Sequence, residues 1–307
     1  MHLSRLMFLI ILNCIFAASL FANGTDCAEW GYAEMDLNKD CYVNMKYFAI
    51  FCNQWMICSH PLDENCEKLN KALVVAHRGY SAIAPENTIA AFNACYGYAD
   101  LVEFDIHSSA DGVLVAIHDS NVARTTDGTG LVSSFTLAEL KALDAGSWFG
   151  AEFAGEQIPT LQESIEAILP TMTPCIERKA GTAQQYVDLL VSMDVIKNVV
   201  IISFSEAFLN DVRELNADVK LGLLGSADLT ETLDSMIVRL KTNGIDIVDW
   251  YHARLNADNV KKIKSIGLEA YAWTINDAAT MENLIDIGVE GITTDQPVTA
   301  RTVIDQY

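Results

Sequence analysis

The sequence predicts a (β/α)8 TIM-type barrel over residues 71–307, and three observations lead to this fold class. Short apolar runs of strand type alternate with segments of helical periodicity, which is typical of a parallel sheet with helical crossovers. Polar side chains able to do chemistry stand at or near the ends of several runs, where barrel enzymes carry their sites. No G-x-G-x-x-G motif follows the first run, which disfavours the alternative, a doubly wound dinucleotide-binding sheet.

Residues 1–22 have the pattern of a secretory signal peptide. Arg5 precedes an apolar run, Leu6–Phe16, and small residues follow up to Ala22, where we expect cleavage. This pattern predicts a secreted, periplasmic or cell-surface protein. An uncleaved anchor is the alternative, but the run is short for a membrane span, and no other stretch approaches about 18 uninterrupted apolar residues.

Residues 23–70 form a separate cysteine-rich module with a loop and a helix. Dense cysteines after a signal peptide predict disulfides in an oxidising compartment, and the absence of a C-x2-C pair disfavours zinc. The cysteines of the module are Cys27, Cys41, Cys52, Cys58 and Cys66. Their number is odd, so at least one is free or pairs elsewhere.

One loop of this module has the side-chain spacing of an EF-hand calcium loop, D-x-N-x-D-x-x-x-N. With the helical periodicity that follows, it resembles half of a dockerin, which implies a calcium site and a protein partner. Cys41 replaces the usual glycine, and Tyr47 stands where a carboxylate would complete the coordination. A disulfide-held appendage is the alternative, in which these oxygens only cap turns. The loop residues are Asp36, Asn38, Asp40 and Asn44.

The first expected barrel strand, Leu73–Ala76, ends in His77 and Arg78. Glu86 and Asn87 stand just before a helix that Thr88 can cap. We expect turn and cap roles for Glu86 and Asn87 rather than substrate contact.

The second expected strand, Leu101–Ile106, carries Glu103 and Asp105, which alternation places on one face. The third, Val113–Ile117, ends in His118. No helix separates these two strands, which is irregular for an alternating barrel. Residues 120–173 then form an insertion after the third strand. If it leaves from the strand end that bears His118, it would lie above the site and contribute to substrate selectivity. An elaborated loop with its own apolar cluster is the alternative.

Alternation resumes after the insertion, with helices near 182–193, 206–215, 229–242, 256–266 and 278–287. The nine strand candidates exceed the eight needed for closure, so we expect that one of them, a short one, is not a strand. The remaining candidates are Pro174–Glu177, Val199–Ile202, Lys220–Leu224, Ile245–Val248, Glu269–Trp273 and Gly291–Thr293.

Three carboxylates from two strands, Glu103, Asp105 and Glu177, form an oxygen set suited to Mg²⁺ or Ca²⁺. His77 and His118 can take up and release protons.

Three further side chains are candidates for substrate binding. Arg78 can grip phosphate with two parallel hydrogen bonds or pair with a barrel carboxylate. Lys179 can neutralise phosphate or offset the carboxylates. Trp273 can form an apolar wall or pack in the core.

The order of these motifs resembles the glycerophosphodiester phosphodiesterase family over residues 73–300. The resemblance implies hydrolysis of small glycerophosphodiesters to glycerol 3-phosphate and an alcohol, with Glu103, Asp105 and Glu177 holding the metal and the two histidines as base and acid. The matching motifs are H-R-G at 77–79, P-E-N-T at 85–88, E-x-D at 103–105, H-D at 118–119, E-R-K at 177–179, S-F at 203–204, W-T-I-N at 273–276 and T-T-D at 293–295.

The formal net charge of −21 argues against nucleic acids and anionic membranes as electrostatic partners. A diester substrate is also an anion, so local charge from Arg78, Lys179 and a metal must attract it. Two other functions stay open: a lyase or phospholipase acting on intact lipids, and a non-catalytic binding barrel. The alcohol, the metal, the identity of the base, and attack by water or by a neighbouring glycerol hydroxyl also stay open.

Overall fold

The computed structural model describes residues 71–169, 171–229 and 233–307. The expected signal peptide, the cysteine-rich module and its calcium-loop residues Asp36, Asn38, Asp40 and Asn44 lie outside the described residues. The barrel and its insertion are described almost completely.

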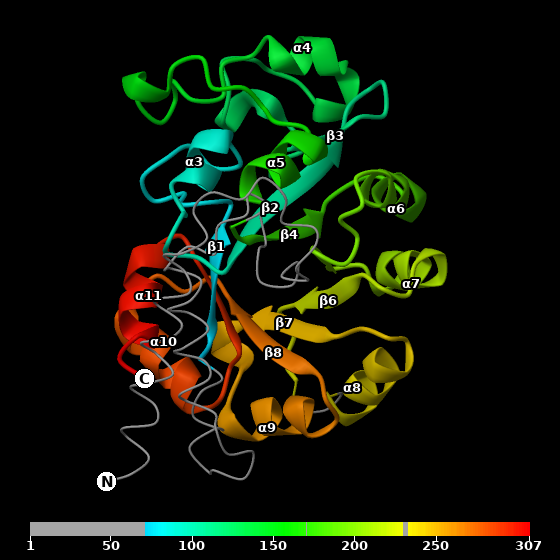
Figure 1. Ribbon diagram of the computed structural model, residues 1–307, viewed down its shortest axis with the longest axis vertical. Helices are drawn as coiled ribbons and strands as arrows, with labels where there is room; N and C mark the ends of the chain where they lie inside the picture. The colour runs from blue at the N-terminus through cyan, green and yellow to red at the C-terminus, as the bar shows by residue number, and fades with distance from the viewer. Residues whose placement is uncertain (1–70, 170, 230–232) are drawn as a thin grey trace, which may run out of the picture. The chain divides into compact units, whose positions relative to one another are not determined.

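Eight parallel strands form a closed barrel, which confirms the predicted fold class (Figure 1). Around the barrel the order is β1-β9-β8-β7-β6-β5-β4-β2, and parallel pairing of Val75 with Leu101 closes β2 onto β1. The strands are β1 (Leu73–His77), β2 (Leu101–Ser108), β4 (Thr173–Arg178), β5 (Val200–Ser203), β6 (Lys220–Gly225), β7 (Ile247–Tyr251), β8 (Glu269–Trp273) and β9 (Gly291–Thr294).

The ninth strand, β3 (Leu114–Ala116), is real but lies outside the closure. It pairs antiparallel with the far end of β2, with Ile106 opposite Ala116. A tight turn at Ser109 and Gly112 connects the two, which explains the absence of a crossover helix between them. The expectation that one of the nine candidates is not a strand is therefore wrong, and the surplus strand is a hairpin extension of β2.

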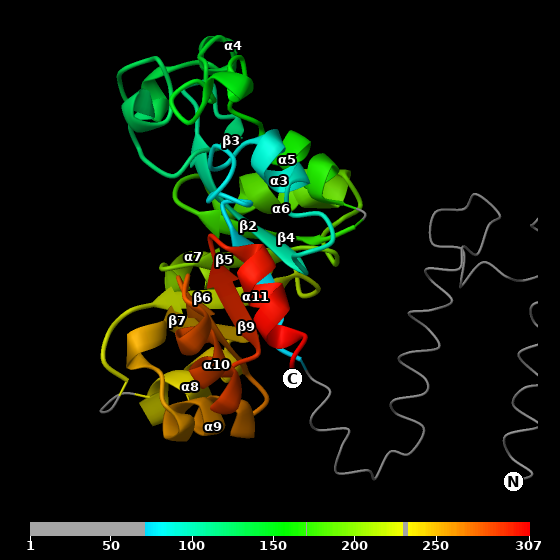
Figure 2. The same ribbon diagram turned by 90° about the vertical axis from the view of Figure 1, so that its left-hand side faces the viewer.

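Helices cover the outer face of the barrel (Figures 1 and 2). Several begin with threonine caps; Thr160 and Thr182 make reciprocal capping boxes with the residue three positions on. None of the helices in the described part of the chain has the length and apolar character that a membrane crossing requires. The helices are α3 (Ile89–Asn93), α5 (Leu161–Ile168), α6 (Ala183–Ser192), α7 (Glu206–Leu215), α8 (Leu233–Thr242), α9 (Ala257–Ser265), α10 (Ala278–Asp286) and α11 (Pro297–Ile304).

Alternation along β2 separates the core from the site. Phe104 is fully buried in the layer between strands and helices, where its ring contacts Phe92 of α3. Leu101 belongs instead to an apolar cluster that includes Val75 and Ile247 of other strands. Glu103, two residues beyond Leu101, shares its face of β2.

The insertion between β3 and α5 has its own apolar cluster, as the loop interpretation expects. Val122, Val132 and Leu140 pack there with Ile117 and Ile158. The insertion extends beyond the ends of β2 and β3 (Figures 1 and 2). Its elements are η2 (Val122–Arg124), η3 (Val132–Ser134), α4 (Leu137–Lys141) and η4 (Ala151–Phe153).

Candidate active site

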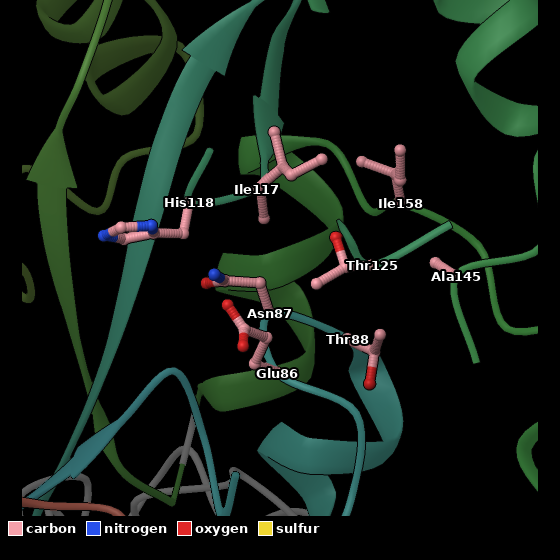
Figure 3. Close-up of a pocket in the computed structure, with 9 residues that line it drawn as sticks. Glu86, Asn87, Thr88, Ile117, His118, Thr125, Ala145 and Ile158 are labelled. Carbon is pink, nitrogen blue, oxygen red and sulfur yellow. The ribbon is translucent and has the colours of Figure 1, made fainter. Parts of the chain in front are cut away.

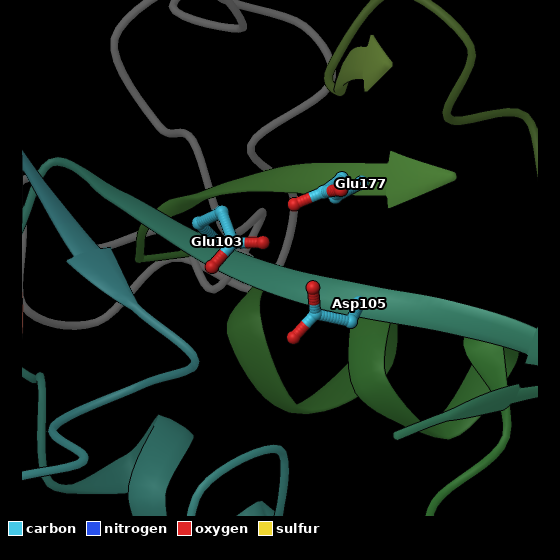
Figure 4. A group of neighbouring side chains, drawn as sticks. All are labelled: Glu103, Asp105 and Glu177. Atoms are coloured by element: carbon cyan, nitrogen blue, oxygen red, sulfur yellow. The ribbon is translucent and has the colours of Figure 1, made fainter. Parts of the chain in front are cut away.

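The structure brings the three predicted carboxylates together. Asp105 of β2 is the register partner of Glu177 of β4, and Glu103 lies one inward position earlier on β2 (Figure 4). One oxygen of each carboxylate lies within 4.8 Å of the other two, and all three residues are buried.

This carboxylate group fits a hard cation. Glu103 is only 2% exposed, and its Oε1 has no hydrogen-bond partner among the described residues. A buried carboxylate oxygen without a partner is costly, so the site favours a ligand that such an oxygen can bind. Oxygen-only donors are those that Mg²⁺ and Ca²⁺ take.

The acidity of the three carboxylates differs. Burial raises the pKa of Glu103, and repulsion from Asp105 and Glu177 adds to the effect. Burial and repulsion from Asp105 raise the pKa of Glu177 to about 7. Burial acts the same way on Asp105, but Lys179 and Arg78 outweigh it and lower its pKa to about 2. Negative charge on the buried, mutually repelling carboxylates is therefore unfavourable, and a bound cation would offset this repulsion.

Both predicted phosphate-binding cations contact these carboxylates. Lys179 Nζ lies 3.0 Å from Asp105 Oδ1 and also pairs with Glu177. Arg78 Nε lies 3.2 Å from Asp105 Oδ2, and its backbone N–H donates to Glu103 Oε2 at 3.0 Å. The carboxylate-pairing roles considered for Arg78 and Lys179 are thus present in the structure.

Asn87 and Glu86 do more than shape a turn, in contrast to the expectation from sequence. Thr88 is the helix cap. Asn87, at φ 58°, donates from Nδ2 to Asp105 Oδ2 at 2.9 Å and accepts from the Asp105 backbone N–H at 3.0 Å. Glu86 Oε1 accepts a hydrogen bond of 2.9 Å from Arg78 Nη1. Both side chains therefore position site residues.

His77 at the end of β1 is held by a carboxylate that the sequence analysis did not assign. Its Nδ1 lies 2.6 Å from Asp295 Oδ1, and since a carboxylate only accepts, Nδ1 carries the proton. Two neutral donors hold Asp295: Ser81 Oγ at 3.0 Å and Asn276 Nδ2 at 2.6 Å. Although burial acts to raise it, the pKa of Asp295 is lowered to about 2, mainly by its hydrogen bond with His77. Asn276 and Asp295 are the last residues of two of the noted motifs. Asp295 directly follows β9 and Asn276 stands three residues after β8, and these positions were the available signal.

His118 has a similar arrangement. Its Nδ1 lies 2.7 Å from Asp119 Oδ1, and Asp119 accepts in turn from Arg124 of the insertion, at 2.7 Å from Nε. Glu86, Asn87 and His118 line the same pocket (Figure 3). His107 Nε2 lies 3.1 Å from the His118 carbonyl oxygen, so His107 supports the backbone here.

Trp273 forms part of an aromatic wall at the carboxyl ends of the strands. Its Nε1 donates to the Asp249 carbonyl at 3.2 Å, which fixes the ring. Phe204 and Tyr251 pack against it at centroid distances of 5.8 and 5.6 Å, and they are 54% and 37% exposed. Trp273 is half-buried, so it is neither a pure core residue nor a free surface one.

Known proteins resemble this chain over the barrel. The sequence profile of the glycerophosphoryl diester phosphodiesterase family matches residues 77–299. A glycerophosphodiester phosphodiesterase of Caldanaerobacter subterraneus is 38% identical over 242 residues, covering 76% of this chain and 98% of that protein. One from Bacillus subtilis is 34% identical, covering 74% and 85%. The structure of an Oleispira antarctica phosphodiesterase in complex with the product sn-glycerol-3-phosphate has a TM-score of 0.68 and 32% identity, over 76% of this chain and 96% of that one.

Proposed function

Because the chain belongs to the glycerophosphoryl diester phosphodiesterase family, we propose that it hydrolyses glycerophosphodiesters to glycerol 3-phosphate and an alcohol, with the help of a divalent metal. The observation that carries the proposal is the buried carboxylate group of Glu103, Asp105 and Glu177 beside two histidines, each held by an aspartate. The product-bound Oleispira structure supports the choice of substrate class.

Glu103, Asp105 and Glu177 would hold the cation. When bound, it supplies Lewis-acid polarisation and neutralises charge on the phosphate. With all groups ionised, these three carboxylates together with Arg78 and Lys179 leave one net negative charge, which a divalent cation turns into one net positive charge. The site then attracts a diester monoanion although the whole chain is acidic. With a cation beside the carboxylates, Arg78 and Lys179 can donate hydrogen bonds to phosphate oxygens.

His77 and His118 transfer the protons. Nδ1 of each histidine donates a hydrogen bond to a carboxylate, Asp295 for His77 and Asp119 for His118. Nε2 is therefore the nitrogen that exchanges protons in the reaction. One histidine removes the proton of the attacking oxygen, which belongs to water or to a neighbouring glycerol hydroxyl. The other protonates the leaving alcohol, so that it departs as a neutral molecule.

Trp273 provides an apolar wall against the carbon chain of the substrate, together with Phe204 and Tyr251. The exposed parts of these rings would become buried on binding, at a gain of about 25 cal/mol per Å² of apolar surface. Their hydrogen-bonded and edge-to-face packing keeps the wall rigid before the substrate arrives.

The test is release of glycerol 3-phosphate from glycerophosphocholine by the purified full chain, first with EDTA and then with Ca²⁺ or Mg²⁺ restored. We expect metal-dependent release and loss of turnover in His77→Ala with metal binding retained. Turnover should stay normal in the control Arg239→Ala, whose side chain pairs with Glu206 on the outer helices. Intact phosphatidylcholine, assayed in parallel, should not be cleaved. A folded protein that releases nothing with either metal would contradict the proposal.

We propose that the protein is exported and cleaved near Ala22. Supporting this are the charge and apolar pattern of residues 1–22 and the cysteine-rich segment that follows. N-terminal sequencing of protein recovered outside the expressing cells checks the site; recovery only inside the cells, with residues 1–22 intact, would contradict export.

We propose a second calcium site in residues 23–70, with a protein partner for this module. A calcium titration should then show two sites, one lost in Asp36→Ala and the other in Glu103→Gln. A single site, insensitive to Asp36→Ala, would leave the module as a disulfide-held appendage.

A further inference from the structure

Arg124 lies in the insertion, at the end of η2, yet its guanidinium reaches two carboxylates of the active site. Nε and Nη2 donate to Asp119 at 2.7 and 3.2 Å. Nη1 and Nη2 donate to Glu86 at 2.7 and 2.8 Å. Both contacts are bidentate, so the planar guanidinium fixes the orientation of each carboxylate as well as its distance.

Each of these carboxylates holds one side chain assigned to the reaction. Asp119 Oδ1 lies 2.7 Å from His118 Nδ1, and Glu86 Oε1 lies 2.9 Å from Arg78 Nη1. One guanidinium therefore connects the proton-transfer group of the hairpin extension with the phosphate-binding group at the end of β1.

Asp119 needs such support. Its side chain is about one-third exposed, at 34%, and it follows His118 directly in an irregular segment. A carboxylate on a solvent-facing segment can rotate, and the imidazole would rotate with it. The Arg124 hydrogen bond is the main cause that holds the pKa of Asp119 well below its usual range, which shows how closely the two groups interact. Asp295, its counterpart beside His77, has a similar exposed fraction, 32%, but it is held by two neutral donors.

We propose that Arg124 is a positioning residue: it orients His118 through Asp119 and Arg78 through Glu86 without touching the substrate. The insertion thereby supplies a structural part of the active site. This inference rests on the proposed function, in which His118 transfers a proton and Arg78 binds phosphate.

Arg124→Ala, Arg124→Lys and the control Arg239→Ala test the proposal. Arg239 of α8 makes a similar bidentate pair with Glu206 of α7, at 2.7 and 2.9 Å, on helices of the outer layer, and its side chain is comparably exposed. We expect kcat to fall about 10²-fold in Arg124→Ala, because small misplacements of catalytic groups cost about that much. Arg124→Lys should retain only part of the wild-type kcat, since lysine lacks the planar guanidinium fork. Free guanidinium, added at a non-denaturing concentration, should restore much of the kcat of Arg124→Ala. Arg239→Ala should match wild type.

A second measurement does not depend on turnover. The proton on His118 Nδ1, assigned by its loss in His118→Asn, should give a protected downfield NMR resonance in wild type and in Arg239→Ala. It should broaden or vanish in Arg124→Ala.

The outcomes separate the two proposals. If wild type hydrolyses no glycerophosphodiester, the proposed function fails, and the NMR result alone decides whether Arg124 positions His118. If wild type is active and Arg124→Ala keeps both its kcat and the His118 resonance, the inference is wrong. Loss of turnover that guanidinium does not restore, with an unchanged His118 resonance, would overturn it as well.

Discussion

Replacing Glu177 by Gln should stabilise the metal-free protein at alkaline pH and abolish its stabilisation by metal. In the folded state the pKa of Glu177 rises from 4.5 to about 7, through burial and repulsion from Asp105. A folded pKa above the unfolded one contributes stability that is complete below pH 4.5 and is lost as the pH rises through about 7. The amide of Gln does not ionise, so Glu177→Gln avoids this loss of stability as the pH rises.

The magnitude follows from the shift. A rise of the Glu177 pKa from 4.5 to about 7 corresponds to about 3 kcal/mol of folding free energy at a pH above both values. Asp105, whose pKa is lowered to about 2, affects stability only at much lower pH and does not obscure this window. Glu177 also accepts a hydrogen bond from Lys179, which the Gln carbonyl can still accept. At roughly 2–4 °C per kcal/mol for a barrel of this size, the midpoint should rise by about 6–12 °C.

The assay is thermal unfolding of the full chain in EDTA at about pH 5 and about pH 8, repeated with Ca²⁺ or Mg²⁺. The control is Glu269→Gln at the start of β8, whose carboxylate pairs with Lys220 at 2.7 Å and lies outside the acidic group. We expect the unfolding midpoint of Glu177→Gln to exceed that of wild type only at the higher pH without metal. Added metal should change the midpoint of the control Glu269→Gln as much as that of wild type. If Glu177→Gln lowers the midpoint equally at both pH values in EDTA, Glu177 is a structural partner of Lys179 and the reasoning is refuted.

Three further predictions concern proton transfer, metal binding and the substrate wall. Asp295→Asn should lower kcat by about 10²–10⁴-fold in steady-state assays, because His77 loses the acceptor that sets its tautomer; a change in KM alone would contradict this role. Metal affinity should rise with pH up to about 7, because protons on Glu103 and Glu177 compete with the ion; calorimetric titrations that give a flat profile would argue against these ligands. Trp273→Ala should raise KM for glycerophosphocholine several-fold and Trp273→Leu much less; equal KM values for all three proteins would place the ring outside the substrate site.

Local patterns were sufficient to predict the metal-binding candidates. Alternation in an extended strand is a consequence of backbone geometry, so Glu103 and Asp105 had to share a face wherever β2 lay. The parallel order of strands then placed Glu177 beside them, since neighbouring strands of a barrel present their carboxyl ends together.

The hydrogen-bond partners of the site could not be derived from local patterns. Asp295 lies 218 residues after His77, and the contact depends on β9 pairing with β1. Arg124 reaches Glu86 across 38 residues because the insertion folds back on its own apolar cluster. Sequence spacing contains no information on such distances.

The sequence by itself determined the strand and helix periods, the inward-facing acids and the polar strand ends, because these follow from covalent geometry and local side-chain preferences. Only the tertiary structure decided which eight strands close, and that β3 extends β2 outside the barrel. Closure is a non-local balance of strand pairing and core packing, so it also decided that Asp295, at the end of β9, holds His77 of β1.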